Sequence, residues 1–191
     1  MADKRAIQAT AIPEHKAKSL YPEPFASLVK HRTRRRLGDH FGLANFGVNL
    51  TTLAPGAISA LKHHHGLQDE FVYVLSGNPT LRHGEEEYRM SPGECIGFKG
   101  GSGLAHQLLN PGEVEAVYLE LGDRLAGDTV QYPDDDLALV QGADGAVVHL
   151  AAGLRSGLEL RPDSDRLLAA SHAHHAHEGQ TRKRERARLG N

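Results

Sequence analysis

The chain has 191 residues, of which 39% are apolar and 21 are glycine, and its formal net charge is −2. This length suits one domain with a substantial core, and the glycine content favours a turn-rich β protein over a disordered chain. A single cysteine excludes an internal disulfide, and no N-terminal apolar run is typical of a signal peptide or a membrane span. We therefore expect a cytoplasmic protein with no membrane partner.

Charge is distributed unevenly along the chain. Residues 1–36 carry nine Lys or Arg against three acidic residues, and residues 178–191 carry five against two. The residues between them carry eight against nineteen, so the body of the chain is acidic. A nucleic-acid-binding protein carries positive charge on its folded surface, so this pattern argues against a nucleic-acid partner and is compatible with a cation site.

The first 20 residues are polar and weakly patterned, which predicts a loose N-terminal arm, either a flexible end or a segment that crosses a neighbouring subunit. A basic run, HRTRRR, follows at His31–Arg36. We interpret this run as a solvated strand and not as a nucleic-acid patch, because Thr33 and Leu37 lie in register with it and the adjoining sequence is acidic.

Three strand-like segments follow the basic run. Leu43–Leu53 alternates apolar and polar residues, and Ala57–His65 follows it after a turn. Phe71–Ser76 is apolar on both faces, because Val72 and Val74 alternate with other large apolar residues. Such a strand needs cover on both faces, from the arm or from a second subunit. We therefore expect a homodimer.

The remaining pattern also consists of short strands between turns. The expected strands are Thr80–Arg82 paired with Tyr88–Met90 in a hairpin, Cys95–Phe98, a segment around His106 after a glycine-rich loop, and Val114–Leu121, with a further hairpin that turns at Ala143–Gly145. No helical period is long enough for βαβ units. The sequence therefore predicts an all-β fold, an antiparallel jelly-roll β-barrel.

A cluster of metal-ligand residue types lies in this predicted barrel. His63 and His65 share a face of their strand, because successive side chains in a strand alternate. Glu70 enters the same space at the start of the next strand, and His106 adds a fourth donor from a distant segment. Three histidines and one carboxylate suit one divalent transition metal, namely Mn, Fe, Zn, Ni or Co. Asp69 is an alternative to Glu70 if the intervening turn is one residue tighter.

The spacing of these residues resembles a known family. The motif H-x-H-x4-E-x6-G ends at Gly77, and G-x2-H-x3-N runs from Gly103 to Asn110. Together they are similar to the two motifs of the cupin superfamily. The resemblance covers about residues 21–150 and is strongest to small single-domain bacterial cupins that are often named sugar-phosphate isomerases. It implies a cupin-like jelly-roll, a metal held by the four donors and paired barrels.

Other residues near the motifs are less informative. Lys62, His64 and Gln107 flank the metal-ligand residues but are expected on the opposite face. Lys99, beside the glycine loop, is a candidate for an anionic substrate group, and Tyr73 and Phe98 belong either to the pocket or to the core. His83 and His149 lack partners at ligand spacing. The His-rich tract, residues 172–180, is a second possible metal-binding segment, which we interpret as adventitious.

These observations predict three segments: an N-terminal arm (1–20), a cupin β-barrel domain (21–153) and a C-terminal tail (154–191) that is a short helix or disordered. The leading hypothesis for function is a metal-dependent enzyme that isomerises a small polar substrate, such as a sugar phosphate or a carboxylate. The sequence identifies no catalytic acid or base. An Fe-dependent dioxygenase and a non-catalytic ligand- or metal-binding module remain alternatives, because both would use the same four donors.

Overall fold

The computed structural model describes residues 5–15, 19–141 and 147–151. By its internal contacts the chain divides into Met1–Leu154 and Arg155–Asn191, and every described residue lies in the first of these units. The expected turn at Ala143–Gly145, the tail and its His-rich tract lie outside the described residues. No helix in the described part of the chain is both long enough and apolar enough to cross a membrane.

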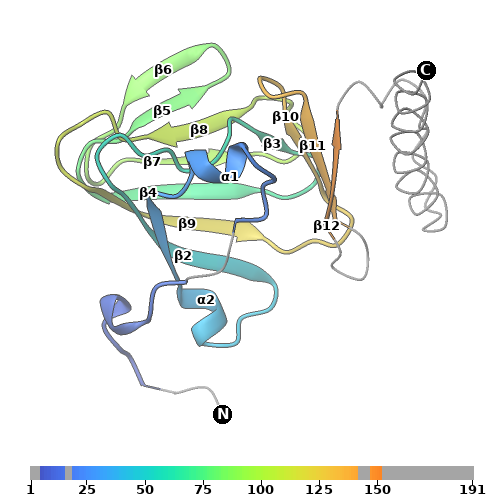
Figure 1. The fold of residues 1–191 in the computed structure, drawn as a ribbon. Helices are drawn as coiled ribbons and strands as arrows, with labels where there is room; N and C mark the ends of the chain where they lie inside the picture. The colour runs from blue at the N-terminus through green and yellow to red at the C-terminus, as the bar shows by residue number, and fades with distance from the viewer. Residues whose placement is uncertain (1–4, 16–18, 142–146, 152–191) are drawn as a thin grey trace, which may run out of the picture. The chain divides into compact units, whose positions relative to one another are not determined.

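Strands dominate the described residues, as Figure 1 shows. The short helical elements are a 3-10 helix at Ala9–Ala11, α1 at Phe25–Leu28 and α2 at Leu37–His40. The strands are β1 Arg32–Arg36, β2 Phe46–Leu53, β3 His64–His65, β4 Glu70–Ser76, β5 Thr80–His83, β6 Glu86–Arg89, β7 Cys95–Phe98, β8 His106–Leu109, β9 Ala116–Asp123, β10 Thr129–Tyr132, β11 Leu137–Gln141 and β12 Val147–Ala151.

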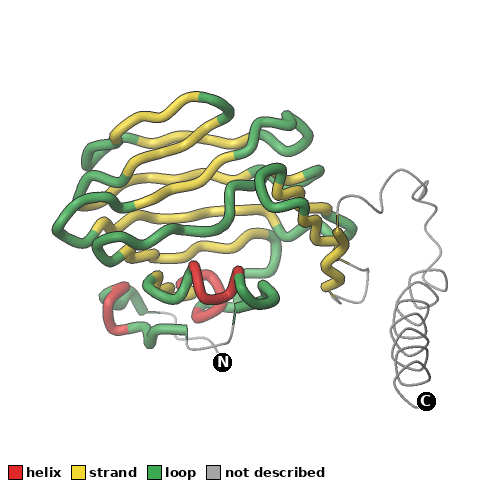
Figure 2. Tube along the Cα trace, turned by 45° about the horizontal axis from the view of Figure 1, so that its top comes forward, coloured by secondary structure: helices red, strands yellow, loops and turns green. Residues whose placement is uncertain are grey.

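The strands form three antiparallel sheets, and many of them run side by side in Figure 2. These sheets make two layers. One layer is a five-stranded sheet in the order β1-β2-β9-β4-β7. The other combines a three-stranded sheet, β6-β5-β8, with a four-stranded sheet, β12-β11-β10-β3. Isolated bridges from Ile58 to Leu109 and from His63 to His106 connect β8 to the segment that leads into β3. The crossing connections and the two layers are those of the predicted jelly-roll.

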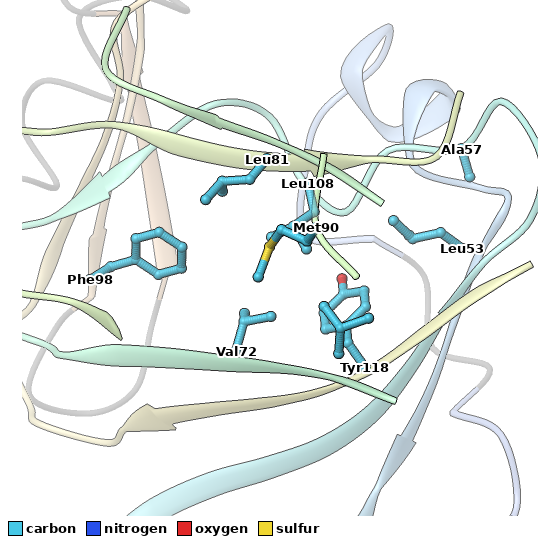
Figure 3. Close-up of a cluster of buried hydrophobic side chains, with 9 residues drawn as sticks. Leu53, Ala57, Val72, Leu81, Met90, Phe98, Leu108 and Tyr118 are labelled. Atoms are coloured by element: carbon cyan, nitrogen blue, oxygen red, sulfur yellow. The ribbon is translucent and has the colours of Figure 1, made fainter. Parts of the chain in front are cut away.

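The main core lies between the two layers (Figure 3). Leu81 and Leu108 reach it from the three-stranded sheet, and Val72 and Tyr118 reach it from the five-stranded sheet. Because apolar side chains on facing sheets exclude water from each other, this packing holds the layers together.

Two residues of the expected motifs stabilise turns of this barrel. Gly77 has a φ of +73°, and a Cβ there would lie 2.4 Å from the Glu115 carbonyl oxygen, so a larger residue does not fit. Asn110 is 2% exposed, and its side-chain amide donates hydrogen bonds to the carbonyls of Leu53 (2.9 Å) and Val114 (2.8 Å). Its side-chain oxygen accepts from the Gly112 amide at 3.2 Å. The contacts of Asn110 connect the segment after β8 to the end of β2 and to the turn before β9.

Strand β4 has the two apolar faces that the sequence predicts. Val72 and Val74 are buried in the core at 3% and 0% exposure. Phe71, Tyr73 and Leu75 are 39%, 38% and 44% exposed, so this face of the five-stranded sheet is apolar and in contact with solvent in the single chain. Tyr73 therefore belongs to neither the core nor the pocket.

The structure differs from the expected elements in four places. The hairpin strand expected at Tyr88–Met90 is β6 at Glu86–Arg89, because it pairs along the whole of β5 up to His83. The segment Ala57–His65 is mostly irregular, and only His64 and His65 form a strand, because its other backbone contacts are isolated bridges. The strand expected from Leu43 begins at Phe46, and short α2 precedes it. The strand expected at Val114–Leu121 begins at Ala116 and extends to Asp123.

The basic run forms β1 as predicted, but the expectation that it is solvated is wrong for two of its arginines. Arg32 and Arg34 alternate with residues that face outward, and both line the cavity inside the barrel. Arg35 lies on the other face, where its guanidinium donates hydrogen bonds to the Ile12 carbonyl (2.5 Å) and to Glu14 (3.0 Å). These contacts and the burial of Ile12 attach part of the N-terminal arm to β1.

Candidate metal centre

Backbone pairing brings distant parts of the chain to one point. The His63 amide donates to the His106 carbonyl at 3.0 Å, and the His106 amide donates to the His63 carbonyl at 2.7 Å. This pair of bonds places the two residues directly opposite each other across the junction of two sheets. Glu70 begins β4 in the facing layer. A site built this way draws side chains from both layers of the barrel.

The structure brings all four expected metal-ligand side chains together. Glu70 Oε2 lies 3.0 Å from His106 Nε2, 3.4 Å from His65 Nε2 and 3.6 Å from His63 Nε2. Ligand atoms of His63, Glu70 and His106 all lie within 4.8 Å of one another. The four side chains are between 7% and 19% exposed, so the cluster is largely shielded from water.

The polarity of the facing atoms indicates a cation. The Nδ1 of His63 donates to the Leu61 carbonyl at 2.8 Å, and the Nδ1 of His65 donates to Asp128 at 2.5 Å. In the neutral imidazole this leaves each Nε2 as an acceptor with its lone pair directed at Glu70. Glu70 Oε2 is buried and has no hydrogen bond of ordinary geometry. Acceptors that face one another need a positive charge between them, and the donor set fits a divalent transition metal.

The electrostatics of these groups follow from their crowding. Burial alone would raise the pKa of Glu70, but the facing imidazoles of His106 and His63 hold it well below its usual range. Burial would lower the pKa of His63, yet the Glu70 carboxylate raises it. At His106 burial dominates, so its pKa is lowered despite the same carboxylate. Glu70 is therefore ionised, as a metal ligand must be.

Comparisons with known proteins identify the family to which this fold belongs. A family model described as a cupin domain matches residues 49–122. A solved structure from Silicibacter pomeroyi, named as a sugar phosphate isomerase from the cupin superfamily, is 35% identical. It aligns with 82% of this chain and 97% of its own, with a TM-score of 0.74.

The chain belongs to the cupin superfamily.

Further structures are similar to this cupin. One from Acidithiobacillus ferrooxidans, provisionally named a sugar phosphate isomerase, is 32% identical over 69% of this chain and 81% of its own, with a TM-score of 0.62. The polyketide cyclase RemF from Streptomyces resistomycificus is 19% identical over 63% of this chain and 80% of its own. Its TM-score of 0.51 shows a shared fold alone. No curated protein matches the sequence.

Asp128 orients one histidine of the cupin site and is not predicted by the sequence. It is 2% exposed, and besides the His65 imidazole it accepts the Leu67 amide at 2.8 Å. It therefore holds both a candidate ligand and the turn that leads to Glu70. Carboxylates that bond the second nitrogen of a ligating histidine fix its tautomer and orientation. No local signal identifies Asp128, because it lies 63 residues from His65 in the chain.

Asp69, the alternative to Glu70, turns away from the cluster. Its carboxylate accepts the Gly100 amide at 2.8 Å, which ties the glycine loop to the start of β4. Lys99 is exposed and does not line the main cavity. Phe98 is buried and stacks on the His106 ring with centroids 3.6 Å apart, so it both lines the pocket and belongs to the core.

The other flanking residues take structural positions. Lys62 lies 3.8 Å from Asp134 in an ion pair, and Gln107 donates to the Ala60 carbonyl at 2.7 Å. His83 makes an edge contact with Phe98 at 5.5 Å between ring centroids. The side chain of His149 lies outside the described residues.

A cavity of about 980 Å³ extends from the four-residue cluster through the barrel. The N-terminal segment around Tyr21, strand β1 and the inner faces of β4, β9 and β10 supply its walls. Glu120 lines it on β9, where it lies 2.7 Å from Arg34 and accepts the Thr51 hydroxyl at 3.3 Å. The arrangement can admit a small molecule to the candidate metal site and surround it with charged side chains.

Proposed function

We propose that this cupin binds one divalent transition metal through His63, His65, Glu70 and His106 and isomerises a small polar substrate, a sugar phosphate or a carboxylated sugar. The observation that carries the proposal is the meeting of four acceptor groups beside a cavity large enough for such a molecule. The names of the two relatives that are more than 30% identical support the same activity.

A bound divalent metal would polarise a substrate carbonyl and make the neighbouring carbon-bound hydrogen more acidic. The residues of the chain then have to orient the substrate and accept that proton. Phe98 and the barrel walls shield the site from water, which strengthens every charge interaction inside it. His65 is held in one tautomer by Asp128, so its Nε2 stays directed at the shared point.

We propose Glu120 as the group that accepts the proton. Three carboxylates line the cavity in the described part of the chain, at Glu23, Glu70 and Glu120. Glu70 faces the histidines, and Glu23 accepts the Ser27 hydroxyl among exposed residues. The Glu120 side chain is 16% exposed. Glu120 pairs with Val72 across β9 and β4, two residues along β4 from Glu70, which places it near the metal-ligand cluster. A carboxylate in this position meets the requirement for a general base.

Hydrogen exchange tests the proposed activity. Protein loaded with Mn²⁺ or Zn²⁺ is expected to exchange the carbon-bound hydrogen of a phosphorylated or carboxylated sugar in D₂O under argon, detected by proton NMR. Isomerisation needs a Lewis acid and no oxygen. When the same reaction is run in air, no oxygen should therefore be consumed. Activity of the Fe²⁺ form alone, with oxygen uptake equal to product, would instead establish a dioxygenase. Ligand binding without turnover across a broad panel of sugars would establish a binding module.

We further propose that two chains pair through the exposed face of the five-stranded sheet. Phe71, Tyr73 and Leu75 form an apolar stripe on β4, and partly buried Leu119 and Leu121 continue it on the neighbouring β9. Contiguous exposed apolar residues are typical of protein interfaces. A second copy of the same sheet supplies a matching surface, as twofold pairing requires.

Light scattering after size-exclusion chromatography is expected to give the mass of a dimer at micromolar concentration. Tyr73→Arg should weaken the dimer by at least about 100-fold, because an unpaired charge buried in an apolar interface costs several kcal/mol. Tyr88→Arg is the matched control, since Tyr88 is similarly exposed but lies on β6 in the other layer. A wild-type monomer would contradict the proposal.

A further inference from the structure

Three arginines of strand β1 line the cavity that the metal cluster adjoins, namely Arg32, Arg34 and Arg36. Arg36 is about half exposed and pairs with Asp39, so Arg32 and Arg34 are the two that enter the interior. The side chain of Arg34 is 30% exposed although it lies inside the barrel, so that exposure is to the cavity. Arg32 donates a hydrogen bond to the Ser59 carbonyl, and in the described part of the chain it forms no ion pair. Guanidinium groups seldom enter a protein interior without an anionic partner, because removing a charge from water is costly.

The carboxylates present do not balance this charge. Glu120 pairs with Arg34 at 2.7 Å, and among the described residues Arg32 has no ion pair of its own. Burial accordingly lowers the pKa of Arg32, although the guanidinium remains protonated. Arg32 and Arg34 together with Glu120 therefore add a net positive charge to the cavity, which the metal-ligand cluster also lines.

Buried polar atoms in this region also lack partners. Arg34 Nε is buried without a hydrogen bond, and Tyr118 Oη approaches Ser59 but makes no hydrogen bond of ordinary geometry. Both residues line the cavity, and Tyr118 is 1% exposed. Such atoms are usually satisfied by a ligand or by ordered water. An oxyanion is the group that matches these donors, since it only accepts hydrogen bonds.

We propose that Arg32 and Arg34 form an oxyanion-binding site that holds the phosphate or carboxylate group of the substrate. The proposal rests on the proposed function only in assigning the anion to a substrate; anion binding itself needs neither a metal nor turnover. A substrate held here by one end presents its remaining atoms to the metal-ligand cluster, because both sites line one cavity. The arginines thus select small anionic substrates, and the metal-ligand cluster determines where the reaction occurs.

Binding of inorganic phosphate to the full-length chain, followed by isothermal titration calorimetry, tests this site. Phosphate should bind saturably to the wild type and to His106→Ala, in which the metal-ligand cluster is broken. Arg32→Gln and Arg34→Gln should each weaken binding about 10–100-fold, the effect of losing a hydrogen bond to a charged group. Arg35→Gln is the matched control, since Arg35 is on the same strand but faces outward, and it should change the affinity less than about twofold.

Acetate in place of phosphate identifies the anion. Tighter binding of phosphate assigns a phosphate ester, and tighter binding of acetate assigns a carboxylate. Should Arg34→Gln fail to fold, Arg34→Lys keeps the charge near Glu120 and should still weaken binding about tenfold, because it loses the planar donor edge. Equal phosphate affinity in the Arg34→Lys and Arg35→Gln variants would overturn the proposal, as would loss of all binding in His106→Ala. Absence of isomerase activity with phosphate binding intact would reject the proposed function and leave this site standing.

Discussion

His106→Ala is expected to leave the purified protein with less than about a tenth of the metal that the wild type holds. The substitution removes the imidazole whose Nε2 lies 3.0 Å from Glu70, and with it the only candidate ligand on β8. Two histidines and Glu70 then remain to hold the metal. Loss of a residue that hydrogen-bonds to a ligating side chain typically costs about 10–100-fold in metal affinity. Loss of the ligating side chain itself should therefore cost more than about 100-fold. Elemental analysis of protein purified without an affinity tag measures the occupancy.

His83→Ala is the control for this experiment. His83 pairs with His106 in the strand register and touches the same Phe98 ring, but it is not part of the cluster. Its replacement should leave the metal content unchanged. Full occupancy in His106→Ala would show that the four-residue assignment is wrong.

Asp128→Asn provides a graded comparison within the same series. The amide keeps the size of the side chain but offers the His65 Nδ1 a weaker acceptor, and the ligand itself stays in place. Metal affinity should therefore fall about 10–100-fold, less than in His106→Ala. The metal-induced rise in the unfolding temperature should be smaller in Asp128→Asn than in the wild type, and smallest in His106→Ala. The reason is that stabilisation by a bound metal depends on its affinity for the folded state.

Glu120→Gln is expected to reduce hydrogen exchange of the substrate by about 100- to 10,000-fold, the usual contribution of a positioned general base. Glutamine has nearly the same shape and can still accept the Thr51 hydroxyl, so the wall of the cavity should persist. Metal content should remain at the wild-type level, because Glu120 is outside the four-residue cluster. Proton NMR in D₂O measures the exchange rate.

Two comparisons separate a base from a structural role for this carboxylate. Glu120→Asp retains the charge and should recover part of the activity, whereas a residue needed only for packing would not respond to the charge. Glu87→Gln, on the exposed hairpin where Glu87 pairs with Arg82, should exchange hydrogen at the wild-type rate. An unchanged rate in Glu120→Gln would mean that another group accepts the proton.

The strands were predictable because alternation is a local property of the chain. The expected range Cys95–Phe98 agrees with β7, and the apolar run Phe71–Ser76 agrees with β4 apart from Glu70 at its start. The observed strand boundaries differ from the predicted ones where the backbone has no regular pairing partner, as in the segment before His64. His63, His65 and Glu70 were predictable as a cluster for the same reason, since all three lie within eight residues of the sequence.

The inner and outer faces of β1 were not predictable in the same way. Its polar residues alternate as in any strand, but both faces are charged, so no hydrophobic contrast indicates which side faces the core. Only the pairing of β1 with β2 decides that Arg32 and Arg34 point into the barrel and Arg35 points out. The sequence therefore predicts solvated arginines, and the sheet shows that two of them enter the interior.

The sequence by itself determined the all-β architecture, the alternation of each strand and the three histidines of the candidate metal site. It left Asp69 and Glu70 as alternatives for the carboxylate, and the structure places Glu70 at the histidines. The tertiary structure decided which distant side chains meet them: Asp128 at His65 and Glu120 at Arg34. These partners lie more than 60 residues apart in the chain, and the register of separate strands brings them together. Local propensity carries no information about such contacts, because they arise only when the two layers of the barrel close.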